Sequence, residues 1–185
     1  MRTVFIHTTL IFMLCFAMYV FQNETNQWFA YYHNLVAKGQ VWRLLTAHLC
    51  HTNGYHLLLN SIGLIVVVTL FINTFKKYSL IPLSIFSGLF IGISLFYFES
   101  DVHSYVGLSG VLHGLFAFAV CDELKRKEKW AYALAVGFTV KISWEQLNGP
   151  STNTESLIAA TVLINAHLYG AISGIVYFLF TRLKI

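Results

Sequence analysis

Six long stretches of the chain are almost entirely apolar, and short polar segments separate them. They run approximately over residues 4–21, 55–74, 78–98, 109–121, 130–147 and 156–181. All but the fourth are close to the ~20 residues that a helix needs to cross the hydrocarbon core of a membrane. The pattern therefore predicts an all-α membrane protein whose six helices form one bundle. We expect a single domain over residues 1–185, with no soluble domain.

The fourth stretch, residues 109–121, is shorter than the others. At ~1.5 Å per residue it extends roughly 20 Å, which is less than the ~30 Å thickness of the core. A charged run over residues 122–129 fixes one end of this helix, so Ser109 is expected to begin it about 10 Å below the opposite surface. Irregular backbone at that depth must be satisfied by protein or by water. We therefore expect a short fourth helix that opens into a water-filled cavity, with Ser109 at the floor of that cavity.

Composition and charge agree with a membrane protein and set its orientation. The chain is 57% hydrophobic and only 11% charged, against roughly 25% charged residues in soluble domains. If the N-terminus is cytoplasmic, nine of the twelve Lys and Arg residues lie at cytoplasmic ends of the stretches, as the positive-inside rule requires. We expect both termini in the cytoplasm and no nucleic-acid partner. The first stretch lacks a small-x-small cleavage site, so we interpret it as a retained anchor.

Two motifs place polar groups inside apolar stretches, where such groups usually mark a functional site. Gly107-Leu108-Ser109-Gly110 puts a serine between glycines, and His167 shares a helix face with Gly170 and Gly174. These small residues would let two helices approach closely and bring the imidazole within the ~2.6–3.2 Å that a general base needs. Either motif alone is common in helix packing. Together they indicate a nucleophile and its base.

A third polar cluster precedes and enters the second stretch, and it includes His51, His56 and Asn60. His56 and Asn60 are four residues apart, so they share a helix face and can both donate hydrogen bonds to an oxyanion. Three histidines and a cysteine within nine residues could instead bind zinc. The spacing matches no common zinc pattern, and no carboxylate is near. We therefore expect neither a metal nor another cofactor.

In this order along the chain, the motifs resemble those of the rhomboid intramembrane serine proteases. The resemblance rests on Trp42-Arg43, His51-x4-His56-x3-Asn60, Gly107-x-Ser109-Gly110 and Ala166-His167-x2-Gly170. It implies that Ser109 and His167 form a catalytic dyad without an acid. It also implies that oxyanion donors come from His56, Asn60 and the backbone around Gly107 and Leu108. Trp42-Arg43 would belong to the loop after the first helix.

The segment G-L-S-G-V-L-H-G further resembles the rhombosortase branch, because His113 stands where many rhomboids have a tyrosine that packs on the catalytic histidine. Lys141 and Glu145 also look like that branch. This implies a bacterial inner-membrane location, a site open to the periplasm, and membrane-protein substrates with a C-terminal sorting tail of the Gly-Gly type. From the residues alone, Lys141 and Glu145 are expected to form an ion pair that lowers their burial cost. A sharper hypothesis is that one of them, or His113, orients His167 or contacts substrate, and His51 is a further possible supporting residue.

An intramembrane serine endopeptidase is therefore the leading hypothesis, with either rhombosortase or general rhomboid specificity. Transfer of the acyl group to an amine instead of water stays open. Two other functions are alternatives: a rhomboid-like protein that escorts membrane proteins without catalysis, and a metal- or haem-binding membrane protein that uses the histidines. The escort function does not need both Ser109 and His167, and this chain has both.

Overall fold

The computed structural model describes residues 1–183, and nearly all of its regular structure is helical. The long helices are α1 (Arg2–Val20), α5 (Gly54–Leu70), α7 (Leu80–Phe98), α8 (Ser109–Lys125), α9 (Lys129–Asn148) and α11 (Ile164–Leu183). The short elements are α2 (Gln22–Phe29), β1 (Tyr31–Tyr32), α3 (His33–Ala37), α4 (Arg43–Thr46), η1 (Ala47–Leu49), α6 (Ile72–Lys77), β2 (Ser104–Tyr105) and α10 (Thr152–Ile158). A long helix thus covers most of each predicted apolar stretch.

The membrane-spanning character of these helices differs from one to another. Within the described residues, α1, α7 and α11 are long and apolar enough to cross a membrane on their own. The segment Arg43–Leu49 together with α5 is a fourth candidate, bent by 92° at its break. The structure therefore supports a helical membrane protein, and the crossing of all six long helices stays a prediction.

The fourth long helix is longer than predicted. α8 has 17 residues, the same length as α5, and it continues to Lys125 instead of ending at Cys121. The acidic residues Asp122 and Glu123 do not end it, because both are buried and form ion pairs with Arg126. The depth argument from a thirteen-residue helix is therefore wrong, although Ser109 is the first residue of α8, as expected.

The sixth stretch is not one continuous helix, which corrects its predicted start at residue 156. Ala159 ends α10 in the left-handed region, with φ +52°, and α11 begins only at Ile164. A non-helical segment over residues 159–163 separates the two helices. This break places the start of α11 beside the site described below.

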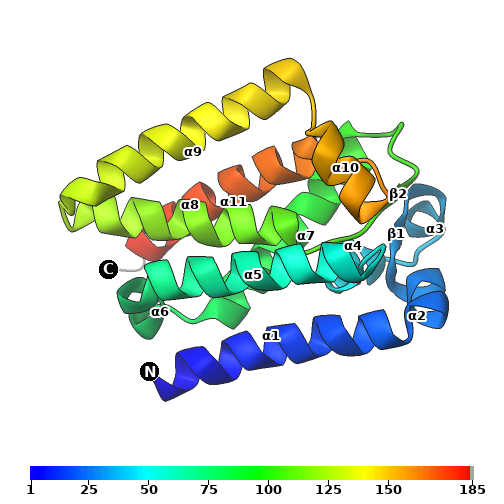
Figure 1. The fold of residues 1–185 in the computed structure, drawn as a ribbon, viewed down its shortest axis with the longest axis horizontal. Helices are drawn as coiled ribbons and strands as arrows, with labels where there is room; N and C mark the ends of the chain where they lie inside the picture. Colours follow the sequence, from blue (N-terminus) through cyan, green and yellow to red (C-terminus); the bar gives the residue numbers. More distant parts are fainter. Residues whose placement is uncertain (184–185) are drawn as a thin grey trace.

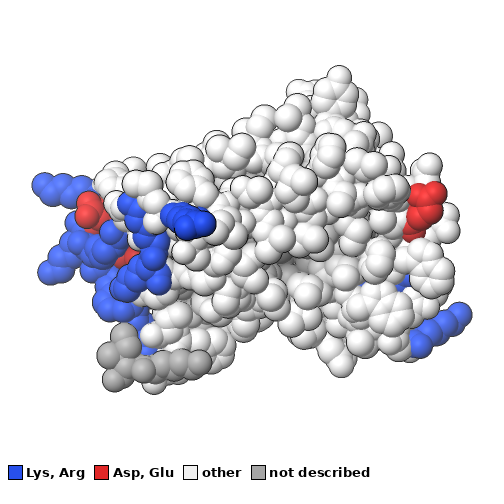
Figure 2. Space-filling model, turned by 90° about the horizontal axis from the view of Figure 1, so that it is seen from below, with Lys and Arg blue, Asp and Glu red and all other residues white. Residues whose placement is uncertain are grey.

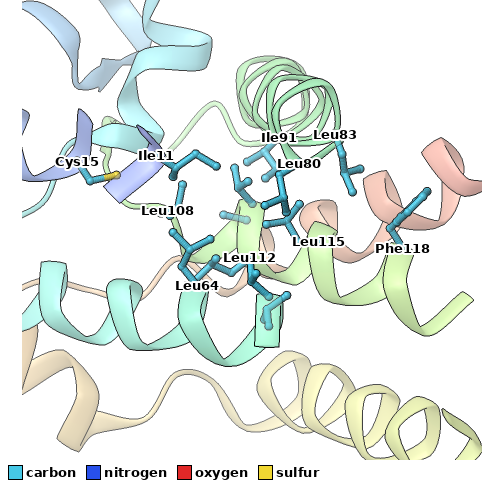
Figure 3. Packing of buried hydrophobic residues seen from close by; sticks show 14 of the residues in the cluster. Ile11, Cys15, Leu64, Leu80, Leu83, Ile91, Leu108, Leu112, Leu115 and Phe118 are labelled. Carbon is cyan, nitrogen blue, oxygen red and sulfur yellow. The ribbon is translucent and has the colours of Figure 1, made fainter. Parts of the chain in front are cut away.

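The bundle is organised around α8, which packs against α5, α7, α9 and α11. In Figure 1, α8 and α11 run side by side in the middle, α1 lies along one edge and α9 along the other. α1 begins and α11 ends at the same end of the bundle (Figure 1). Figure 3 shows the apolar core between these helices, where Ile11, Leu64, Ile91 and Leu115 converge from α1, α5, α7 and α8.

Glycines make the contact between α8 and α11 unusually close, as the sequence predicts. A Cβ atom built on Gly170 would lie 2.0 Å from the carbonyl oxygen of Gly110. A Cβ atom on Gly174 would lie 2.1 Å from the carbonyl oxygen of Gly114. Real Cβ atoms essentially never approach within 3.0 Å of such atoms. Backbone therefore packs directly on backbone along this pair, as in small-residue helix contacts in membranes.

The segment between α1 and α5 folds into short elements held together by one buried arginine. Arg43 is 2% exposed and donates hydrogen bonds to the carbonyl oxygens of Ala30, at 2.6 Å, and Gln27, at 2.7 Å, and to the side chain of Gln40. β1 pairs with β2 in antiparallel register, Tyr31 opposite Tyr105. This pairing connects the segment to the strand that leads into α8.

Candidate active site

Ser109 and His167 meet at the close contact between α8 and α11. The Nε2 atom of His167 lies 3.1 Å from Ser109 Oγ, and His167 is 6% exposed. The backbone contacts of Gly170 with Gly110 and of Gly174 with Gly114 hold the two helices at this separation. The predicted approach of the two side chains is thus confirmed, and the distance lies within the range for proton transfer between a base and a nucleophile. Their catalytic roles stay a prediction.

A carboxylate contacts the other nitrogen of the same imidazole. Glu145 Oε2 on α9 lies 3.0 Å from His167 Nδ1 and 2.8 Å from Lys141 Nζ. The expected Lys141–Glu145 ion pair is therefore confirmed, but the pair does not stand alone. The side chain of Glu145 is 17% exposed and that of Lys141 is 42% exposed, so the carboxylate is the more buried partner.

His113 covers the face of the histidine ring. Its ring stacks on that of His167, with centroids 4.1 Å apart and an interplanar angle of 14°. The Nδ1 atom of His113 lies 2.7 Å from the carbonyl oxygen of Ser109, and its Nε2 atom contacts Lys141 Nζ. The stacking position inferred from the resemblance is thus confirmed.

His113, Glu145 and His167 place three potential metal-ligand atoms within 4.8 Å of one another. The Lys141 ammonium contacts two of these side chains, and the third, His167, is hydrogen-bonded to Glu145 and Ser109. A metal ion would have to displace this ammonium and break the Glu145–His167 contact. The bonding of the donor set therefore favours the lysine over a metal.

A pocket of about 630 Å³ opens onto the Ser109–His167 pair. Its walls come from α5, from residues 101–106 before α8, and from the segment between α10 and α11. Asn60 of α5 lines it, is 5% exposed, and its Nδ2 atom has no hydrogen-bond partner among the described residues. Buried amide donors are rarely left unpaired, so this group is available to a ligand carbonyl.

His56 also lines the pocket, and residues before α5 hold it. Thr52 Oγ1 donates its one proton to the Ile158 carbonyl oxygen at 2.6 Å. In its 3.1 Å contact with His56 Nδ1, the same hydroxyl can therefore only accept a hydrogen bond. The Thr52 backbone N–H also lies 3.5 Å from Nδ1, which is beyond the usual range for such bonds. The shorter contact favours a proton on Nδ1, and a neutral His56 then presents a lone pair to the pocket.

The residues that surround His56 lie in different positions relative to the pocket. His51 is fully buried and packs edge-on against the His56 ring, with centroids 5.0 Å apart, and it does not line the pocket. Thr52 was not predicted from the sequence as a partner of His56. A threonine just before the Asn53 cap of α5 is a weak signal, because such residues also occur there for local turn bonding alone.

Gly107 has a structural role that differs from the one predicted. Its N–H donates to the Ala47 carbonyl oxygen at 3.1 Å, so it is not a free oxyanion donor. Its φ of +122° favours glycine, and a Cβ atom there would lie 2.6 Å from His56 Nε2. The amides of Leu108 and Ser109, at the start of α8, precede the internal hydrogen bonds of the helix and remain candidate donors.

Two buried groups behind the serine loop, Tyr105 and His48, were given no part in the serine mechanism from the sequence. Tyr105 donates from its hydroxyl to the Gly107 carbonyl oxygen at 2.9 Å. His48 is 2% exposed, with Nε2 2.9 Å from the Gly88 carbonyl oxygen of α7 and its ring edge-on to Tyr105. Together they fix the backbone turn that presents Ser109. In the sequence each of them is only a polar side chain, and its residue type does not reveal its hydrogen-bond partner.

Comparison with known proteins identifies the family of this chain. The chain is 27% identical over 139 residues to a Bacillus subtilis (strain 168) protein described as "Putative rhomboid protease YdcA". The match covers 75% of this chain and 66% of that protein, so this chain spans slightly less than two thirds of its relative. A family model of the Rhomboid domain matches residues 38–184, which include Ser109, His167 and the side chains described as contacting them. The chain therefore belongs to the rhomboid family.

Proposed function

We propose that this chain is an intramembrane serine endopeptidase in which Ser109 is the nucleophile and His167 the general base. The observation that carries the proposal is the 3.1 Å contact between Ser109 Oγ and His167 Nε2, two residues that line the same pocket. Both residues come from buried helices whose close packing fixes the distance. Family membership and the relative's description support the same activity.

In this mechanism the Ser109 hydroxyl transfers its proton to His167 Nε2 as Oγ attacks the scissile carbonyl. The carbonyl oxygen then carries the negative charge. Collapse of the tetrahedral intermediate breaks the C–N bond, and the proton on His167 passes to the leaving amine. Water then attacks the acyl-enzyme with His167 again as base, which releases the acid and restores Ser109.

Donors for the negative oxygen are available on the α5 side of the pocket and at the start of α8. The unpaired Nδ2 group of Asn60 and the amides of Leu108 and Ser109 fit this role. A single donor of this kind contributes roughly 3–4 kcal/mol to transition-state stabilisation. His56 donates there only if its Nε2 carries a proton. Asn60 is therefore the principal side-chain donor.

The membrane arrangement is part of the proposal. Figure 2 shows most Lys and Arg side chains gathered at the end where α1 begins, with a wide uncharged band beside them. The positive-inside rule then places that end in the cytoplasm and the pocket on the opposite, periplasmic side of a bacterial inner membrane. All six long helices cross the bilayer, and water fills the pocket.

For substrates, we propose membrane proteins with a C-terminal transmembrane sorting tail of the Gly-Gly type, as in rhombosortases. His113, Lys141 and Glu145 support this branch, because they form one connected group around His167. Small residues ahead of a transmembrane tail would also unwind easily into the pocket, since glycine disfavours helix.

The test is cleavage of a reporter with a Gly-Gly-type tail in bacteria that co-express the protein. We expect cleavage by the native chain and none by Ser109→Ala or His167→Ala at matched membrane levels. Equal cleavage by Ser109→Ala would refute the serine mechanism. Cleavage of a general rhomboid substrate but not of this reporter would refute the rhombosortase branch only.

A further inference from the structure

Glu145 contacts His167 in the geometry of the acid in a catalytic triad. Its Oε2 atom accepts hydrogen bonds from both His167 Nδ1 and Lys141 Nζ, at 3.0 and 2.8 Å. The proposed family mechanism uses a serine and a histidine alone, so this third group needs its own explanation.

The direction of these hydrogen bonds determines which nitrogen of His167 carries the proton. An ionised carboxylate has no proton to donate, so Nδ1–H of His167 must be the donor to Glu145. In a neutral imidazole the other nitrogen, Nε2, then carries a lone pair, and this atom faces Ser109 Oγ. Glu145 thus selects the tautomer that can accept the serine proton.

Lys141 and His113 extend this arrangement into a closed ring of contacts. The Ser109 carbonyl oxygen can only accept, so His113 Nδ1 donates to it, and His113 Nε2 is left to accept from the Lys141 ammonium. Lys141 also donates to Glu145. Each hydrogen-bonding atom in the ring has a compatible partner, and the stacked His113 restricts rotation of the His167 ring.

We propose that Glu145 is the positioning residue of His167, and that Lys141 holds the Glu145 carboxylate in place. The inference rests on the proposed function. Glu145 acts through His167 without touching substrate: it fixes the reactive tautomer and stabilises the imidazolium that forms when Ser109 attacks. Because α9 supplies Glu145, three helices contribute to the site: α8, α9 and α11.

The competing explanation is that Glu145 only neutralises Lys141 inside the membrane. The two explanations differ in a double variant. If Glu145 only neutralises Lys141, Lys141→Met/Glu145→Gln removes both charges and restores activity. If Glu145 positions His167, the double variant remains as slow as Glu145→Gln.

The experiment measures the rate at which a fluorophosphonate probe labels Ser109 in the full chain in liposomes, together with kcat and KM for reporter cleavage. We expect Glu145→Gln and the double variant to lose roughly 10²–10⁴-fold in labelling rate and kcat, with KM little changed. Glu145→Asp keeps the carboxylate and should recover at least about tenfold over Glu145→Gln. Glu128→Gln makes the same chemical change at the N-cap of α9, at the opposite end of that helix from Glu145, and should label like the native chain.

A second measurement reports the tautomer directly. Nitrogen-15 NMR of His167, in a Ser109→Ala background, should show the proton on Nδ1 when Glu145 is present. In Glu145→Gln, the preference for the proton on Nδ1 should be lost. Labelling by the double variant within about threefold of the native chain, or an unchanged tautomer, would overturn the role of Glu145. If the native chain is labelled no faster than Ser109→Ala, the proposed function itself fails. This outcome differs from the two outcomes that would overturn the role of Glu145 alone.

Discussion

The glycine contact between α8 and α11 predicts a large effect from adding one methyl group. In Gly170→Ala the new Cβ atom would lie 2.0 Å from the Gly110 carbonyl oxygen, where less than 3.0 Å is not tolerated. The three nearest atoms are all backbone atoms of Gly110, so no side chain can rotate away. The two helices must separate by at least about 1 Å, since overpacking of this kind is relieved by backbone shifts.

This shift acts directly on the site, because His167 lies three residues before Gly170 on the same helix. A separation of about 1 Å would lengthen the 3.1 Å Ser109–His167 contact to roughly 4 Å, beyond the ~2.6–3.2 Å range for a general base. A misplacement of that size can cost about 100-fold in rate. We therefore expect kcat to fall by about two orders of magnitude, with a loss of roughly 1–3 kcal/mol in stability.

The assay compares kcat for reporter cleavage and thermal unfolding in the same membranes for Gly170→Ala and Gly137→Ala. Gly137 lies on α9 and is exposed, and a Cβ atom added there would have nothing within 4 Å. The control should keep native activity and gain up to about 1 kcal/mol from better helix propensity. If Gly170→Ala cleaves within about threefold of the native rate, the glycine contact does not set the distance between base and nucleophile.

Three other predictions concern the oxyanion donors, the buried arginine and metal dependence. Asn60→Ala should lower kcat about 100-fold, and this loss should be larger than that of His56→Ala. A larger loss of kcat in His56→Ala, measured by steady-state kinetics, would mean that His56 Nε2 is the main donor. Arg43→Lys cannot reproduce the hydrogen bonds to Ala30, Gln27 and Gln40. The free energy of unfolding should therefore fall by roughly 1.5–3 kcal/mol, the contribution of a charged hydrogen bond. An unchanged melting temperature would contradict this. Chelators should leave cleavage unchanged, and loss of activity that zinc restores would favour the metal alternative.

The parts of the fold that could be predicted from the sequence are those that depend on local composition. Long apolar runs identify helices because a helix satisfies its own backbone in any apolar surrounding. The ends were harder to place. Asp122 and Glu123 look like the end of a helix, yet they stay in α8 because Arg126 and Thr74 neutralise or bind them. Such partners as Thr74 are distant in sequence, so no local pattern reveals them.

The same limit applies to the site. Ser109, His167 and the glycines could be found because each lies in a short motif with a known geometric consequence. From the sequence, the link from Glu145 to His167 could be raised only as one hypothesis among several, because the i,i+4 pair with Lys141 already explains both charges locally. Likewise, nothing in the sequence predicts that the Gly107 amide is taken by Ala47. These features depend on how helices are placed next to one another.

The separation of Ser109 and His167 along the chain has a consequence for synthesis. The two residues are 58 positions apart, and α9 and α10 lie between them. Helices enter the membrane in order as the ribosome makes them, so a chain that has inserted only as far as α10 has Ser109 but not yet His167. Under the proposed mechanism, activity can therefore begin only after α11 has been inserted and packed, so an incomplete chain would not cleave other newly made proteins at the translocation channel.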